Sequence, residues 1–327
     1  MNGASKHRRL ALADAQRALQ RGDWRSAAQE LERAAELARI EGDAARATHC
    51  LQMASALQRA RGEGARAIAS AGRAGELAGD DLRARFAASA ELGEALIAAG
   101  EFERAAGAYR EALRSAAEIG LPAWAQATVL RRLAEADAGR GALAEAWHGY
   151  EAAAQQMVRI SDALAAAWIH LEHANRAREA GETAHAWALA GRPSVHLLSG
   201  EDPHLASERH LLIARLLHEQ GRFGEAIEHA GRARERALEA VAPLSYYGAA
   251  ALLSQGFEAI GQRTDAYATL ATAWATLGDL LGREVAESWV APLLEACRLK
   301  WGVADFVAAK HEHDDRRRAA LDARKEV

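Results

Sequence analysis

Histidine clusters are the part of this sequence that comes closest to a chemical site. His170 and His173 flank Glu172, and His210 follows one repeat length after His170. Imidazole is the commonest protein ligand of transition metals, so three such rings brought together would hold a metal ion. Histidine also serves as a hydrogen-bonding residue between packed helices, and all three fall where we expect helices to stack. We therefore keep a metal-dependent enzyme only as the less favoured alternative, and expect no metal and no cofactor.

Sequence motifs of catalysis are otherwise missing. His311 to Asp314 lacks the HExxH spacing of zinc proteases, and it begins a charged run to Arg318 that is typical of a solvated helix end. The sequence has no GxxxxGK[ST] phosphate loop, no GxSxG nucleophile elbow and no GxGxxG dinucleotide turn. We expect that the protein is not an enzyme.

Composition and charge exclude several further classes. The 41 Lys and Arg residues against 45 Asp and Glu residues give a net charge of -4, which is the wrong sign for a dedicated nucleic-acid binder. Cys50 and Cys297 lie far apart with no CxxC spacing, which indicates a reducing compartment. No uncharged stretch reaches the roughly 18 residues of a membrane span. We expect a cytoplasmic protein with no membrane span and no nucleic-acid partner.

A glycine recurs along the chain at intervals of about 40 residues, followed five positions later by a small or apolar residue. A period of this length is typical of a solenoid, in which each unit buries its apolar face by stacking on its neighbours. The sequence between the glycines is rich in Ala, Leu, Arg and Glu, which favour helix. The glycines are Gly22, Gly62, Gly100, Gly141, Gly181, Gly221, Gly261 and Gly302.

Each glycine lies between two helical patterns, where one helix must end and the chain must turn with positive φ. Asp43, Asp81, Asp162 and Asp202 precede the first helix of a hairpin, where a carboxylate can cap the helix. The pattern predicts an all-α fold, a right-handed superhelix of about eight tandem helix-turn-helix hairpins in one domain, 1–327. The expected hairpins span about 4–41, 42–80, 81–120, 121–160, 161–201, 202–241, 242–281 and 282–327, the last being a C-terminal cap.

This pattern resembles the tetratricopeptide repeat (TPR) family over nearly the whole chain, through turns such as Gly22-Asp23-Trp24 and Gly100-Glu101-Phe102. The family places small residues seven positions before and twelve positions after the turn glycine, where two helices cross closely. The sequence has small residues at Ala15, Ser55, Gly93, Ala134, Ala174, Ala214 and Ser254, and at Ala34, Ala74, Ala112, Ala153, Ala233 and Ala273.

Three departures from the family pattern carry expectations of their own. The repeat is about six residues longer than usual, which is similar to the repeats of kinesin light chains and of some bacterial ligand-sensing regulators. Pro193 replaces a small residue and should shorten the second helix of hairpin five, leaving Ser194 to Glu201 as a loop. Glu295 replaces a small residue in hairpin eight, which fits a terminal cap.

The resemblance also implies where a partner binds, because the first helix of each hairpin lines the concave groove in such superhelices. One helical stripe of these helices faces away from the stack. Its candidate partner-binding residues are Gln52, Arg59, Arg131, Glu135, Trp168, Asn175, Arg178, Arg215 and His218, and it also contains His49, Glu94, Glu208, Gln255 and Glu258.

Within this stripe, Asn175 occupies a position from which the family often binds a peptide backbone, since an amide both donates and accepts hydrogen bonds. Arg131, Arg178 and Arg215 follow one another on successive hairpins and could present guanidinium groups to a carboxylate-bearing segment. Each of these residues is equally consistent with an ordinary solvated helix face, and Trp168 with packing under the next hairpin.

We interpret the sequence as a non-catalytic interaction module, scaffold or adaptor that binds a protein or peptide in its groove. The alternative is a sensor or regulator that binds a small ligand or peptide in the same groove. Self-association as a homodimer through the segment from Trp289 to Trp301 is a further expectation.

Overall fold

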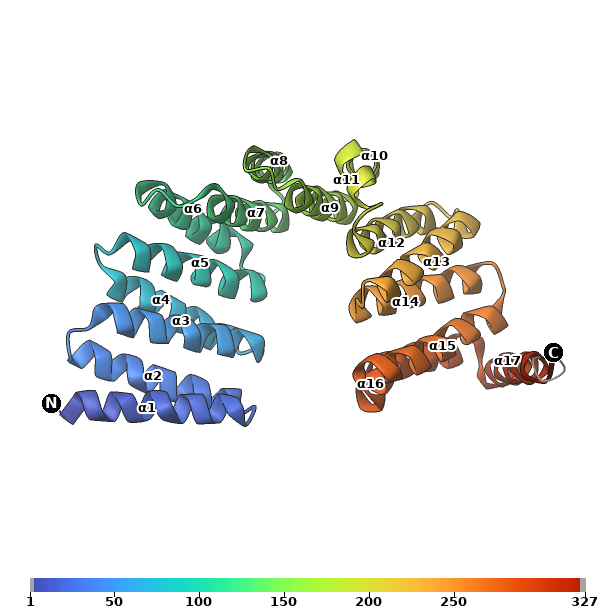
Figure 1. The fold of residues 1–327 in the computed structure, drawn as a ribbon, viewed down its shortest axis with the longest axis horizontal. Coiled ribbons are helices and arrows are strands. Elements are labelled where there is room, and N and C mark those ends of the chain that lie inside the picture. The colour runs from blue at the N-terminus through green and yellow to red at the C-terminus, as the bar shows by residue number, and fades with distance from the viewer. Residues whose placement is uncertain (1–2, 324–327) are drawn as a thin grey trace. The chain divides into compact units, whose positions relative to one another are not determined.

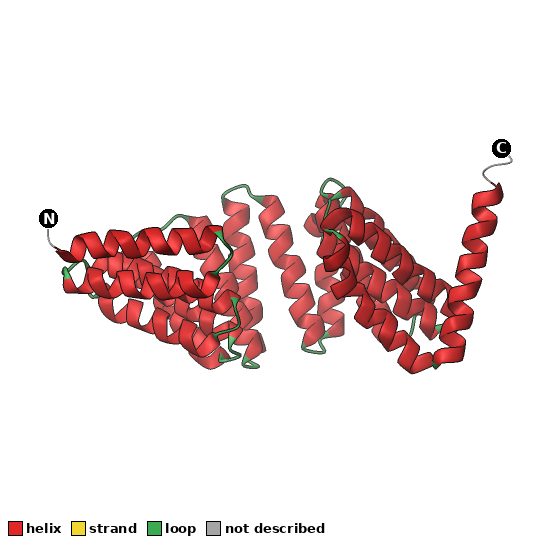
Figure 2. Ribbon diagram, turned by 90° about the horizontal axis from the view of Figure 1, so that it is seen from below, coloured by secondary structure: helices red, strands yellow, loops and turns green. Residues whose placement is uncertain are grey.

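The computed structural model describes residues 3–323, which form helices joined by short turns and contain no strand (Figures 1 and 2). The first helices of the hairpins are α1 (Gly3–Gln20), α3 (Ala44–Ala60), α5 (Leu82–Ala98), α7 (Ala123–Gly139), α9 (Ala163–Glu179), α12 (Pro203–Glu219), α14 (Pro243–Ala259) and α16 (Arg283–Trp301). The second helices are α2 (Trp24–Ile40), α4 (Gly64–Ala78), α6 (Phe102–Glu118), α8 (Leu143–Arg159), α10 (Thr183–Ala190) with α11 (Pro193–Leu198), α13 (Phe223–Glu239), α15 (Arg263–Leu281) and α17 (Val303–Ala323). The predicted all-α solenoid of helical hairpins is confirmed.

The backbone contacts divide the chain into two compact units. Unit 1 ends at Ile169 and unit 2 begins at His170, so that the boundary lies inside α9. In unit 1 the hairpins from α1 to α8 stack in chain order, and in unit 2 the hairpins from α12 to α17 do the same.

The turns and helix starts follow local chemistry. All eight turn glycines have positive φ, between 73° at Gly22 and 86° at Gly302, a region that costs other residues strain. The predicted caps also form: a carboxylate oxygen of Asp43 accepts a hydrogen bond from the amide of Arg46, and Asp202 accepts one from the amide of Leu205.

The close crossings between helices occur at the predicted small residues. The small residues seven positions before the turn glycines are buried in all seven hairpins that have one, and so are the six alanines twelve positions after it. Gly93 shows why size matters, because a Cβ atom added there would lie 2.6 Å from the Tyr109 ring, well inside van der Waals contact. The hairpins therefore stack through contacts that a larger side chain would open.

Hairpin five differs from the expectation in one respect. As predicted, its second helix is short, since α10 ends at Ala190. The predicted loop from Ser194 to Glu201 was wrong, because α11 runs from Pro193 to Leu198 and buries Val195. Proline is well accommodated in the first turn of a helix, where its missing N–H needs no partner, so Pro193 begins a new helix here.

The C-terminal hairpin is tied to hairpin seven. Glu295 is exposed, as expected of a cap. The charged run is not simply solvated: Arg316 pairs with Asp265 at 3.0 Å, and Thr264 donates a hydrogen bond to Glu312 at 2.6 Å.

The two tryptophans proposed for self-association pack inside unit 2. Trp289 contacts Tyr247 with ring centroids 5.4 Å apart, and Trp301 is 8% exposed. Dimer formation through this segment stays a prediction that rests on its other residues, such as the 71% exposed Leu299. Across residues 3–323, none of the helices combines the length and the apolar character required to cross a membrane.

The packing at Gly93 predicts that Gly93→Ala destabilises the protein. Alanine favours a helix interior over glycine by about 1 kcal/mol, but overpacking a buried contact costs about 1–3 kcal/mol. We expect a net loss of up to about 2 kcal/mol in the free energy of unfolding, measured by urea denaturation. Gly107→Ala is the matched control on α6, where an added Cβ meets nothing within 4 Å. That variant should be more stable than wild type, and a stabilised Gly93→Ala variant would contradict the close crossing.

Candidate functional site

The first helices α3, α5 and α7 form one face of unit 1, which we call its first-helix face. The charged side chains of this face are paired with one another. Arg59 of α3 lies 3.6 Å from Glu91 and 3.9 Å from Glu94 of α5. Glu94 also accepts a hydrogen bond from Arg132 of α7 at 2.6 Å. Two of the predicted binding residues, Arg59 and Glu135, are members of this network, since Arg132 also donates to Glu135 at 2.7 Å.

The network reaches into the core through Tyr109, whose hydroxyl donates a hydrogen bond to Glu94 at 2.8 Å. Burial raises the pKa of the Tyr109 hydroxyl, and the neighbouring Glu94 carboxylate raises it further. Burial likewise raises the pKa of the Glu91 carboxyl. These groups fasten α5 to its neighbours, so the paired charges of unit 1 have a structural use.

The remaining predicted residues of unit 1 are all half-buried. Gln52 lies on α3, and its Nε2 atom is buried without a hydrogen-bond partner among the described residues. Arg131 lies on α7 beside Arg132, and Trp168 lies on the part of α9 that belongs to unit 1. The proposed ladder of Arg131, Arg178 and Arg215 is therefore divided between the two units.

In unit 2 the first-helix face is formed by the end of α9 together with α12, α14 and α16. Arg178 of α9 pairs with Glu219 of α12 at 2.6 Å. Asn175 donates a hydrogen bond from Nδ2 to the carbonyl of Leu171 in its own helix at 3.1 Å. Its Oδ1 atom is buried and has no hydrogen-bond partner among residues 3–323, so Asn175 keeps one unused acceptor.

Arg215 of α12 is the exceptional cation of this face. It is half-buried, and no carboxylate of the described chain lies within ion-pair distance of its guanidinium group. Burial lowers the pKa of the Arg215 guanidinium, and the nearby Arg178 lowers it further. The carboxylates of Glu208, Glu179 and Glu219 oppose this lowering of the pKa without forming an ion pair. The Nη2 atom of Arg215 lies near Gly248 of α14, where an added Cβ would be 3.9 Å away, an ordinary contact distance. Arginine stays protonated at neutral pH, and the site therefore holds a positive charge with no direct carboxylate partner among the described residues.

Two adjoining hollows lie on the same face, toward its C-terminal end. The smaller has a volume of about 120 Å³ between α14 and α16, and the larger has about 770 Å³ beside the hairpin turns. Gln255, Glu258 and Lys300 line both. The predicted residue His218 lines the larger hollow and packs edge-on against Phe223, with ring centroids 5.1 Å apart.

Glu258 lines both hollows, and both of its carboxylate oxygens have partners. Its Oε1 atom accepts a hydrogen bond from the indole of Trp301 at 2.5 Å, and its Oε2 atom lies 2.9 Å from the ammonium group of Lys300. Burial and the negative charge of Glu258 raise the pKa of the nearby Cys297 thiol to about 11. The thiol is therefore protonated at neutral pH and serves as an apolar wall.

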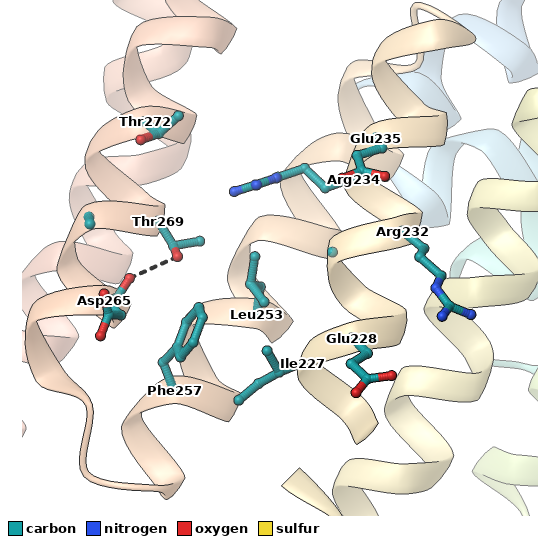
Figure 3. Close-up of a pocket in the computed structure, with 12 residues that line it drawn as sticks. Ile227, Glu228, Arg232, Arg234, Glu235, Leu253, Phe257, Asp265, Thr269 and Thr272 are labelled. Carbon is teal, nitrogen blue, oxygen red and sulfur yellow. Dashed lines mark hydrogen bonds between the residues drawn. The ribbon is translucent and has the colours of Figure 1, made fainter. Parts of the chain in front are cut away.

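The second helices α13 and α15 form another hollow of about 520 Å³ (Figure 3). Ile227, Leu253 and Phe257 form its apolar floor, and Arg234 reaches from α13 toward α15 without an ion pair among the described residues. We call this side of unit 2 its second-helix face. It offers a useful comparison, because it also combines an apolar hollow with an unpaired arginine.

The three histidines of the less favoured metal-site alternative each contact a different side chain. His173 Nε2 lies 3.1 Å from His185 Nε2, and His210 Nδ1 lies 3.0 Å from His229 Nδ1. His170 is buried and contacts Arg192. Within residues 3–323 no three His, Cys, Asp or Glu side chains are arranged to hold a metal ion.

The sequence missed the contribution of hairpin eight to this face. The register of the predicted stripe ended at hairpin seven, with Gln255 and Glu258. Extending it to the next turn glycine, Gly302, identifies Ala296, which lines the smaller hollow. Lys300 and Trp301 had no such signal, because they depend on how α16 closes against α14.

Comparisons with known proteins agree on the fold. No protein-family model matches the sequence, and no curated protein matches it. A signal transduction ATPase with numerous domains from Pyrococcus horikoshii, which has a tetratricopeptide repeat sensor, superposes with a TM-score of 0.60 at 13% identity. A tetratricopeptide repeat protein from Parabacteroides merdae superposes with a TM-score of 0.57 at 15% identity. The chain has the tetratricopeptide repeat fold.

The extent of these matches differs. The matched region covers 86% of this chain and 44% of the Pyrococcus protein, so the chain spans less than half of that relative. It covers 88% of this chain and 99% of the Parabacteroides protein. The TPR resemblance inferred from the turn glycines and small residues is thus confirmed as a likeness of fold.

The pair of His210 and His229 predicts that this TPR solenoid loses stability in acid. Burial, together with the nearby His229, Arg209, Arg232 and Arg236, lowers the pKa of His210 from 6.5 to about 4. The unfolded chain therefore takes up this proton first as the pH falls, so the stability is complete above pH 6.5 and is lost toward pH 4. Between these pH values we expect His210 to reduce the free energy of unfolding by roughly 1 kcal/mol per pH unit.

Thermal melting of wild type and His210→Gln at pH 7.5 and pH 5 measures this effect. Glutamine keeps a polar side chain but cannot titrate, so the melting temperature of the variant should fall less between the two pH values. Equal falls in the two proteins would show that this histidine pair does not carry the pH dependence.

Proposed function

We propose that this chain is a non-catalytic protein-interaction scaffold, and that the first-helix face of unit 2 binds an acidic segment of a protein partner. The observation that carries the proposal is that Arg215 is half-buried and has no carboxylate within ion-pair distance in the described chain. A half-buried cation without a counterion has lost part of its hydration and gained no ion pair in return. A carboxylate from a partner would supply that ion pair, and a guanidinium group can bind it through two parallel hydrogen bonds.

The surroundings of Arg215 support the same class of partner. Arg178 lies close enough to lower the pKa of Arg215, and it is bound to Glu219, an exposed residue whose carboxylate a ligand could displace. The Nε atom of Arg178 and the Oδ1 atom of Asn175 are buried without hydrogen-bond partners in the described chain. Buried polar atoms are nearly always satisfied in native proteins, and these two would be satisfied by the backbone of a bound segment.

The first-helix face of unit 1 is a weaker candidate. Its cations Arg59 and Arg132 already have carboxylate partners within the chain, so an acidic ligand would have to break existing ion pairs. An acidic partner can therefore bind unit 2 at a lower cost in free energy, because no ion pair of Arg215 has to be broken.

A small-ligand sensor is the second candidate function. The larger hollow of about 770 Å³ falls within the roughly 300–1,000 Å³ that small-molecule sites occupy. The Pyrococcus protein described above carries its repeats as a sensor. This function predicts binding of a single metabolite in the larger hollow, without dependence on Arg215.

A peptide-display experiment tests the proposed function. A library of random twelve-residue peptides is selected on the wild-type chain, and the selected peptides are measured by fluorescence anisotropy against Arg215→Gln. We expect selected peptides to contain Asp or Glu, and Arg215→Gln to weaken them by about tenfold to a hundredfold, because a charge-assisted hydrogen bond is lost. The stability of the variant should not fall, since burial already disfavours the charge.

Arg234→Gln provides the matched control on the second-helix face. It removes an arginine of the second-helix face that also has no ion pair among the described residues, and it should change the affinity less than about twofold. Peptides that lose affinity in Arg234→Gln but not in Arg215→Gln would move the binding surface to the second-helix face. Selected peptides without acidic residues would exclude the proposed partner class.

A further inference from the structure

The smaller hollow on the first-helix face of unit 2 has the character of a side-chain pocket. Its apolar wall is formed by Ala251, Leu270, Leu293, Ala296 and Cys297, which come from α14, α15 and α16. Three of these five side chains are no larger than a thiol, so the pocket exists because the residues around it are small. Apolar pockets of this kind fix one side chain of a bound segment.

The volume of the pocket limits what can enter. An apolar cavity of about 150 Å³ accommodates a benzene ring. The 120 Å³ of this pocket therefore suits an aliphatic side chain of leucine or methionine size, and it is too small for a tryptophan. Cationic side chains are disfavoured, because the one carboxylate at the rim, Glu258, is already bonded to Trp301 and Lys300.

The rim of the pocket is suited to a peptide backbone. Gln255 is exposed, and its amide makes no hydrogen bond to the described residues. A side-chain amide both donates and accepts, which matches the alternating carbonyl and N–H groups of an extended chain. Ser254 is not available for this purpose, since its hydroxyl donates to the carbonyl of Ala266 at 3.1 Å.

Arg215 and the pocket belong to the same surface, because α12, α14 and α16 are successive first helices of unit 2. The larger hollow connects them: His218 of α12 lines it together with Gln255 and Lys300, which also line the pocket. A segment bound to Arg215 can thus continue across α14 to the pocket without leaving this face.

We infer that the bound segment carries, besides its acidic residue, one aliphatic side chain of leucine or methionine size that enters the pocket between α14 and α16. The Gln255 amide binds the backbone next to that side chain. This inference rests on the proposed function and adds the second recognition element, so that the partner class becomes an extended acidic segment with a single aliphatic anchor.

The experiment uses the peptides selected on the full chain and combines a change in the peptide with a change in the pocket. Each apolar residue of a selected peptide is replaced by alanine, and binding is measured to wild type and to Ala296→Trp. Ala296 is exposed on α16 at the wall of the pocket, so a tryptophan there, which is too large to enter, covers the pocket without disturbing the core. We expect one alanine replacement to weaken binding to wild type about tenfold or more, as burial of an aliphatic side chain implies.

In Ala296→Trp the anchor has no pocket, so the intact peptide should bind about tenfold more weakly and the same alanine replacement should have no further effect. Ala268→Trp is the matched control, because it fills the hollow of the second-helix face and should leave both affinities unchanged. If Ala296→Trp binds like wild type, or if no apolar residue of the peptides matters, the aliphatic anchor is excluded. Loss of binding in Arg215→Gln would then still support the proposed function, so the two can fail separately.

Discussion

The close crossing of helices at small residues is the constraint on which the rest of the structure depends. Alanine, serine and glycine at fixed distances from the turn glycines let neighbouring helices touch, and these positions are buried wherever a small residue occupies them. Second helices pack against the first helix of the next hairpin, as α2 does with α3 and α13 with α14, and first helices also meet, as α3 does with α5 and α12 with α14. Residues far apart in the sequence thereby come to share one face, as His218, Gln255 and Lys300 do around the larger hollow of unit 2.

The same scaffold carries different chemistry in its two units. In unit 1 Arg59 and Arg132 of the first-helix face bind carboxylates of neighbouring hairpins, so their charges stabilise the stacking of the hairpins. In unit 2 Arg178 and Lys300 also pair with carboxylates, but Arg215 has no such partner among the described residues, and Ala251 and Ala296 line a pocket. A surface with an unmatched cation, an apolar pocket and a free amide is better suited to binding than to packing.

The fold was predictable because its determinants are local and repeat with the period of the chain. The turn glycines, the capping aspartates and the small residues each act through their own backbone or their nearest helix. The details of the site depend on contacts between hairpins. Arg132 joins Glu94, Asn175 donates a hydrogen bond to a carbonyl of its own helix, and Pro193 begins a helix where a loop was expected. Such outcomes depend on the directions of individual side chains, which spacing alone does not specify.

Binding on the first-helix face of unit 2 is the central claim, and the two cysteines of the chain test it most directly. Cys297 lines the pocket, whereas Cys50 is 4% exposed in unit 1 and serves as an internal reference. The measurement is the rate of N-ethylmaleimide alkylation at each thiol at pH 8, with and without a saturating selected peptide. The account predicts that the peptide slows the reaction of Cys297 at least about tenfold and leaves Cys50 unchanged. An unchanged rate at Cys297 with the peptide bound would contradict it.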